Sequence, residues 1–121
     1  MSKFAIDCET VGIRDKSLLA RVSIVNQYSQ VVLDKYVKPT AVVTDYRSFV
    51  SGIKKRDLEN GYSFQSVRNE VTAILDGSML IGHMLRYDLN ALNLSQPKRN
   101  LRDLAKYEPL VSIIFIFNLD S

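Results

Sequence analysis

The pattern of hydrophobic and polar positions predicts strands in the first third of the chain. Residues 19–26 alternate between apolar and polar side chains, and residues 3–11 and 31–37 also have the character of β-strands, the last ended by Pro39. Residues 27–30 form a short link between the last two strands. Three strands joined by short connections are typical of an antiparallel meander.

The rest of the chain changes from strands alone to helices alternating with strands. The segments expected, in chain order, are a helical turn or loop over 44–53, a charged stretch over 54–60, a helix over 63–75, a strand over 79–83, a helix over 85–94 and a possible strand over 100–107. In the first long helix, apolar residues recur at helical spacing from Phe64 to Leu75, and Gly77 follows as a stop. The order predicts an α/β fold whose later strands pair in parallel.

The composition is typical of one globular domain and does not identify a binding partner. The chain has 121 residues, of which 46% are hydrophobic and 24% are charged. The net charge of +3 permits a polyanionic partner without requiring one. Cys8 is the single cysteine, so an internal disulfide is excluded, and we interpret it as a small core residue rather than a reactive thiol. With no secretory signal pattern and no membrane-spanning apolar run, we expect an intracellular protein without membrane contact.

Two acids within the first predicted strand are the most informative feature. Residues 4–12 read FAIDCETVG, with Asp7 and Glu9 two positions apart just before Gly12. Side chains at this spacing point to the same face of a strand, and adjacent carboxylates repel each other unless a cation lies between them. Carboxylate oxygens suit magnesium or manganese. The alternative is an exposed strand that carries two solvated acids.

The last segment departs from the pattern. Residues 110–117 read LVSIIFIF and carry no charge, which would make an exposed strand here prone to aggregation. The segment is either a buried edge strand or a divergent tail.

A second acidic segment, later in the chain, changes how the acids of the first strand are interpreted. Residues 82–92 read GHMLRYDLNAL and place Asp88 in the first turns of a helix. Taken alone, Asp88 is a solvated helix acid. Together with FAIDCETVG, however, it resembles the first two motifs of the DEDD-type 3′-to-5′ exonucleases. The further segments LARVSIVN, DKYVKPT, VTDYRSFVSGI and LRDLAKYEPL resemble the subgroup of RNA exonuclease 4 and the interferon-stimulated and apoptosis-enhancing nucleases.

This resemblance implies a fold, a chemistry and a set of site residues. The fold would be RNase H-like, a mixed sheet flanked by helices and incomplete at its C-terminus. Asp7, Glu9 and Asp88 would be catalytic and would hold two divalent cations, magnesium or manganese, which activate water and relieve charge on the leaving oxygen. The substrate would be the 3′ end of RNA or single-stranded DNA. Thr10, where relatives often carry methionine or phenylalanine, would border the terminal base, and Arg47 is either a substrate contact or a surface arginine.

The third motif of the family is absent. It consists of a histidine, the general base, followed five residues later by an aspartate, whereas the only histidine here is His83, inside the second motif. Asp103 lies in LRDLAKY, where we expect a structural role. We therefore interpret residues 1–110 as a partial exonuclease domain followed by a divergent tail over 111–121, as in a truncated form of a longer enzyme.

Three hypotheses about function remain open from the sequence. The first is an exonuclease with impaired activity, because loss of a general base typically lowers the rate by about 10²–10⁴. The second is an inactive remnant that binds nucleic acid or a partner, and the third is an unrelated α/β domain whose acids coincide by chance. The resemblance also implies a location in the nucleus or nucleolus, while the sequence leaves the oligomeric state open.

Overall fold

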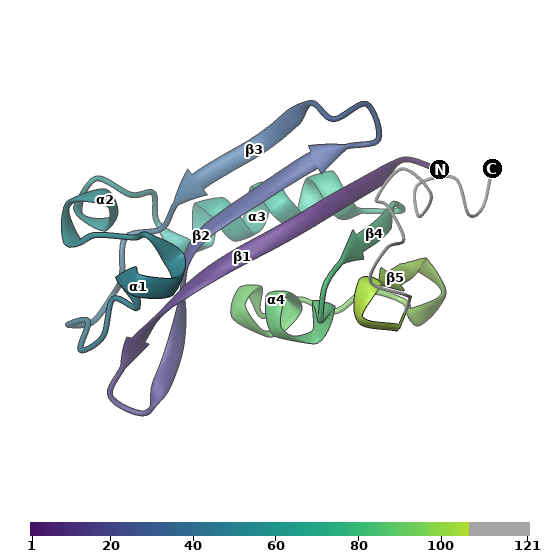
Figure 1. The fold of residues 1–121 in the computed structure, drawn as a ribbon. Coiled ribbons are helices and arrows are strands. Elements are labelled where there is room, and N and C mark those ends of the chain that lie inside the picture. Colours follow the sequence, from purple (N-terminus) through teal and green to yellow (C-terminus); the bar gives the residue numbers. More distant parts are fainter. Residues whose placement is uncertain (107–121) are drawn as a thin grey trace.

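The computed structural model describes residues 1–106, with the backbone alone at residues 49 and 50, and contains one mixed sheet (Figure 1). Its strands are β1 (Lys3–Ile13), β2 (Lys16–Asn26), β3 (Val31–Tyr36), β4 (Met79–Gly82) and β5 (Leu101–Asp103). The strand order is β3-β2-β1-β4-β5, with antiparallel pairing along β1, β2 and β3 and parallel pairing of β4 with both β1 and β5. The predicted meander followed by parallel strands is therefore confirmed.

Helices connect the meander to the parallel strands and continue beyond them. They are α1 (Ser48–Ser51), α2 (Lys55–Glu59), α3 (Phe64–Leu75) and α4 (Leu85–Leu92), with the short 3-10 helices η1 (Lys98–Asn100) and η2 (Leu104–Lys106) on either side of β5. The fifth strand is shorter than predicted, because residue 100 belongs to η1 and residues 104–106 form η2. Within residues 1–106, no helix has the length and apolar character needed to cross a membrane. The predicted tail over 110–117 lies outside the described residues.

The main core lies between one face of the sheet and helices α3 and α4. Val67, Val71 and Leu75 of α3 pack with Ile24 and Leu80 of the sheet, and all five side chains are buried. Ser63 caps α3 by accepting a hydrogen bond from the Ser66 amide at 3.2 Å, as its position before the apolar repeat indicates. The helix predicted over 63–75 is thus confirmed, and its apolar stripe faces the sheet.

The backbone at Gly82 lies close to both Leu85 and the Ile6 carbonyl, and this sets the start of α4 against the centre of the sheet. A Cβ atom on Gly82 would lie 2.5 Å from Leu85 Cδ2 and 3.0 Å from the Ile6 carbonyl oxygen, so no larger residue fits there without movement. Asp103 of β5 then accepts hydrogen bonds from the Met84 amide at 2.8 Å and the Leu85 amide at 3.0 Å. These contacts hold the first turn of α4 between β1 and β5.

Candidate active site

Asp7 and Glu9 lie on the same face of β1, as their spacing predicts. Ala5 packs on the side of the sheet away from the main core, and side chains alternate along the strand up to a bulge after Glu9. Asp7 and Glu9 therefore share the face of Ala5, while Cys8 packs against the main core. The Asp7 side chain is exposed, and Glu9 is partly buried opposite Arg21 of β2.

Asp88 of α4 reaches β1 between these two acids. Its side chain is only 6% exposed, and its Oδ1 accepts a hydrogen bond of 2.9 Å from the backbone amide of Cys8. The parallel pairing of β1 with β4 extends only to Ala5, so this edge of β1 has no strand partner at Cys8. The Asp88 carboxylate satisfies that partly buried amide and brings a third acid to the stretch of β1 that carries Asp7 and Glu9. Ligand sites in open α/β sheets commonly occupy such a gap beyond the carboxyl ends of adjacent parallel strands.

Mutual repulsion and burial affect the protonation of these acids. The pKa of Asp88 rises to about 6 because burial disfavours the charged form, and the negative charge of Asp7 adds to the rise although the Cys8 amide opposes it. The pKa of Glu9 is also raised, first by burial and then by Asp7, against the lowering effect of Arg21. Asp7 thus acts on both other carboxylates, which is the electrostatic condition that a bound cation would relieve.

The same surroundings make Cys8 unsuited to nucleophilic chemistry. Burial, followed by the charge of Asp88, raises the pKa of the thiol far above its ordinary value. The thiol stays protonated and packs against the main core, as the sequence predicts.

The chemistry of the donor set fits a divalent cation, because magnesium and manganese prefer carboxylate oxygens. The distances between these side chains, however, do not form a closed set of ligands around one ion. Across the described part of the chain, no group of three or more His, Cys, Asp or Glu side chains is close enough to hold one ion together. The assignment of Asp7, Glu9 and Asp88 as joint metal ligands therefore stays a prediction.

A cavity of about 390 Å³ lies beside Asp88 and contains both predicted substrate contacts. It is lined by Cys8, Thr10, Ser17, Arg47, Tyr87, Asp88, Asn90 and Ala91. The Arg47 guanidinium donates hydrogen bonds to Thr10 Oγ1 at 2.7 Å and to Ser17 Oγ at 2.9 Å. The backbone around Arg47 is itself tied to β1, because the Gly12 amide donates to the carbonyl oxygen of Asp45 at 2.6 Å.

The structure adds residues to the predicted site and settles the role of one acid. Tyr87 and Asn90 line the cavity beside Asp88, and only the motif in which they occur indicated this in the sequence. Asp103 accepts three backbone hydrogen bonds, from Met84, Leu85 and Ala105. Burial would raise its pKa, but these bonds outweigh burial and lower it. Asp103 therefore has the structural role that the sequence predicts.

Comparison with curated proteins identifies relatives that act on RNA by name. RNA exonuclease 4 of Homo sapiens and of Mus musculus are each 51% identical over 111 residues, which is 89% of this chain and 26% of each relative. RNA exonuclease 4 of Saccharomyces cerevisiae is 45% identical over 108 residues, 87% of this chain and 37% of that protein. The chain thus spans about a quarter to somewhat over a third of the length of these relatives.

Solved structures with the same fold include two nuclease modules. The catalytic unit of Neurospora crassa Pan2, with its protease and nuclease domains, superposes with a TM-score of 0.81 at 23% identity, over 90% of this chain and 20% of that one. The pseudoubiquitin hydrolase–RNA exonuclease module of Saccharomyces cerevisiae Pan2, in complex with AAGGAA RNA, gives a TM-score of 0.78 at 26% identity, over 86% of this chain and 21% of that one. The predicted RNase H-like fold is confirmed. The RNase_T exonuclease family model matches residues 4–113, and the chain therefore belongs to this exonuclease family.

Proposed function

We propose that this chain is a metal-dependent exonuclease domain that removes nucleotides from the 3′ end of RNA or single-stranded DNA. The observation that supports this most is the hydrogen bond between Asp88 of α4 and the amide of Cys8, the residue between Asp7 and Glu9 in β1. RNA is the first substrate to test, because the similar proteins are named RNA exonuclease 4 and a similar Pan2 module was solved with RNA.

Each predicted site residue has a role in this proposal. Asp7, Glu9 and Asp88 would hold magnesium or manganese, which when bound supplies activation of water and neutralises charge on the phosphodiester. Arg47 and Thr10 border the cavity next to Asp88 and would contact the terminal nucleotide. Arg47 would donate to a phosphate or base, and Thr10 would face the sugar or base with a small polar group.

Activity of this chain would be impaired. The sequence contains one histidine, His83, which follows β4 inside the second motif, and the position five residues before Asp120 is Phe115. No histidine in residues 1–121 stands where the family places its general base. A positioned base typically contributes about 10²–10⁴ to the rate, and this is the deficit that we expect relative to RNA exonuclease 4.

The test is the trimming of a 5′-labelled single-stranded RNA with manganese, alongside one of the curated relatives. We expect slow stepwise loss of nucleotides from the 3′ end, abolished in Asp7→Ala and unchanged in Asp15→Ala, an acid exposed in the β1–β2 turn. A rate equal to that of the relative would contradict the impairment. Trimming that survives in Asp7→Ala would contradict the proposed site.

The alternative is a catalytically inactive remnant that binds nucleic acid or a protein partner. The missing third-motif histidine favours it. Calorimetric titration with manganese separates the two, because two binding sites support a competent centre, whereas one site or none supports a remnant. We also propose an intracellular, nuclear or nucleolar location, which imaging of the tagged chain in cells would test.

A further inference from the structure

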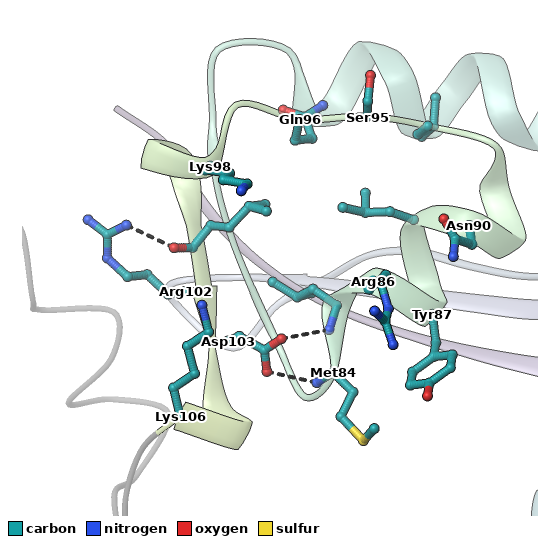
Figure 2. Close-up of a pocket in the computed structure, with 14 residues that line it drawn as sticks. Met84, Arg86, Tyr87, Asn90, Ser95, Gln96, Lys98, Arg102, Asp103 and Lys106 are labelled. Carbon is teal, nitrogen blue, oxygen red and sulfur yellow. Dashed lines mark hydrogen bonds between the residues drawn. The ribbon is translucent and has the colours of Figure 1, made fainter.

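A second cavity lies beside the candidate active site, along α4. It has a volume of about 900 Å³ and separates the exposed side of α4 from the segment that contains η1, β5 and η2 (Figure 2). Its charged lining residues are Arg86, Lys98, Arg102, Asp103 and Lys106. Four of these side chains are cationic and one is acidic, so the cavity has an excess of positive charge.

Three of the four cations, Arg86, Lys98 and Lys106, carry positive charge that a ligand in this cavity could meet. Among the described residues, none of the salt bridges involves Arg86, Lys98 or Lys106. The single acid, Asp103, already accepts three backbone hydrogen bonds. Two of these come from the amides of Met84 and Leu85 at the start of α4, so Asp103 already occupies both donors, and an anion in the cavity would bind the cationic side chains.

The cavity shares part of its lining with the candidate active site, on α4. Tyr87 and Asn90 line both this cavity and the smaller one that contains Asp88 and Arg47. Tyr87 is 57% exposed, and the Arg86 guanidinium lies 5.4 Å from the centroid of its ring. An exposed aromatic ring next to cations is the combination on which single-stranded nucleic acids stack and are neutralised.

We propose that this basic groove, defined by Arg86, Tyr87, Lys98 and Lys106, binds the part of a single-stranded RNA that lies upstream of its 3′ end. The inference rests on the proposed function, which places the 3′ end beside Asp88. A strand that leaves that cavity across Tyr87 enters the groove, where a base stacks on Tyr87. The lysines on the opposite wall neutralise phosphates of the strand (Figure 2).

The groove makes affinity depend on RNA length. The test is fluorescence anisotropy of the whole chain in EDTA, with a labelled RNA of about 12 nucleotides and one of about three nucleotides. For the Lys98→Gln/Lys106→Gln variant, we expect weaker binding of the longer RNA and unchanged binding of the shorter one. The slope of log K against log salt should become shallower by about 1.4, which is about 0.7 for each lost phosphate contact on a single strand.

Two further variants serve as controls. Lys98→Arg/Lys106→Arg keeps both charges and should bind the longer RNA as the wild type does. Lys55→Gln/Arg56→Gln removes two exposed cations from α2, at the opposite end of the sheet from β5 (Figure 1), and should not change the length dependence. Equal weakening in this variant would show a general charge effect and overturn the proposal.

The remaining outcomes separate this proposal from the proposed function. Unchanged binding of the longer RNA in Lys98→Gln/Lys106→Gln would overturn the groove alone, whatever the trimming assay shows. Equal losses for both RNAs would place the lysines at the 3′-end site and also overturn it. Failure of the wild-type chain to bind the longer RNA in EDTA would overturn this proposal, whereas the proposed function is tested separately by the trimming assay with manganese.

Discussion

The guanidinium of Arg47 lies 2.7 Å from Thr10 Oγ1, and this hydrogen bond joins residues 37 positions apart in the chain. The sequence indicated each of them separately as a substrate contact. In the structure they form one unit, because Thr10 accepts a hydrogen bond from the side chain that we expect to meet the nucleic acid. A phenylalanine at position 10 could not accept this bond and a methionine sulfur would accept it only weakly, so Thr10 and Ser17 together orient Arg47.

Thr10→Val should therefore affect RNA binding through Arg47. The change removes the hydroxyl with little change in volume, and it should lower the free energy of unfolding by about 0.5–1.5 kcal/mol. We expect weaker binding of RNA, with Arg47→Lys weakening it further, measured by anisotropy in EDTA. Thr72→Val makes the same chemical change on the exposed side of α3 and should leave RNA affinity intact. Wild-type affinity in both Thr10→Val and Arg47→Lys would show that neither residue meets the substrate.

Asp88→Asn should make the protein more stable at neutral pH. The folded-state pKa of Asp88, about 6, lies above its ordinary value of 3.8, so the folded protein holds this proton more tightly than the unfolded chain. Stability is therefore lost as the pH rises from about 4 to about 6, by at most about 3 kcal/mol. Asparagine cannot ionise and can still accept a hydrogen bond from the Cys8 amide.

Urea denaturation at pH 4 and pH 8 tests this prediction. The stability gain of Asp88→Asn over the wild type should be present at pH 8 and shrink towards pH 4. A gain of the same size at both pH values would mean that ionisation of Asp88 is not its cause.

Divalent cations should raise the melting temperature of the wild-type chain. Manganese at tenfold its dissociation constant would stabilise the folded state by about 1.4 kcal/mol, which shifts the melting temperature of a domain of this size by several degrees. Asp7→Asn should abolish the shift and Glu9→Gln should reduce it, because both remove a carboxylate from β1. The shift should persist in Asp15→Asn. An equal shift in Asp7→Asn would place the bound cation elsewhere.

Asp103→Ala should loosen α4 without touching the acids of β1. The variant leaves the amides of Met84 and Leu85 without their carboxylate partner, and loss of a helix cap costs about 0.5–2 kcal/mol. Asp103→Asn keeps an acceptor and should lose less. Urea denaturation gives the stabilities, and hydrogen exchange of the α4 amides should quicken more in the alanine variant. Equal protection of α4 in all three proteins would contradict a capping role.

Local sequence patterns identified most of the strands and the two longer helices. The apolar spacing in residues 63–75 and the serine cap were enough for α3, because helix periodicity and capping depend on neighbours within a few positions. The pattern did not identify α2 as a helix, because a charged five-residue segment with one buried leucine, Leu58, has no periodicity to detect. The resemblance of FAIDCETVG and GHMLRYDLNAL to family motifs indicated the acids, but not their surroundings.

Tertiary structure alone decided how exposed each acid is and what it contacts. Asp7 lies in a mostly apolar strand, yet its side chain is exposed. Asp88, a solvated acid by its helix pattern alone, is buried against Cys8. The reason is that β4 stops pairing with β1 at Ala5, and this leaves an open strand edge for α4 to fill. This unpaired strand edge results from the lengths of two strands far apart in the chain, and no local pattern of residues encodes it.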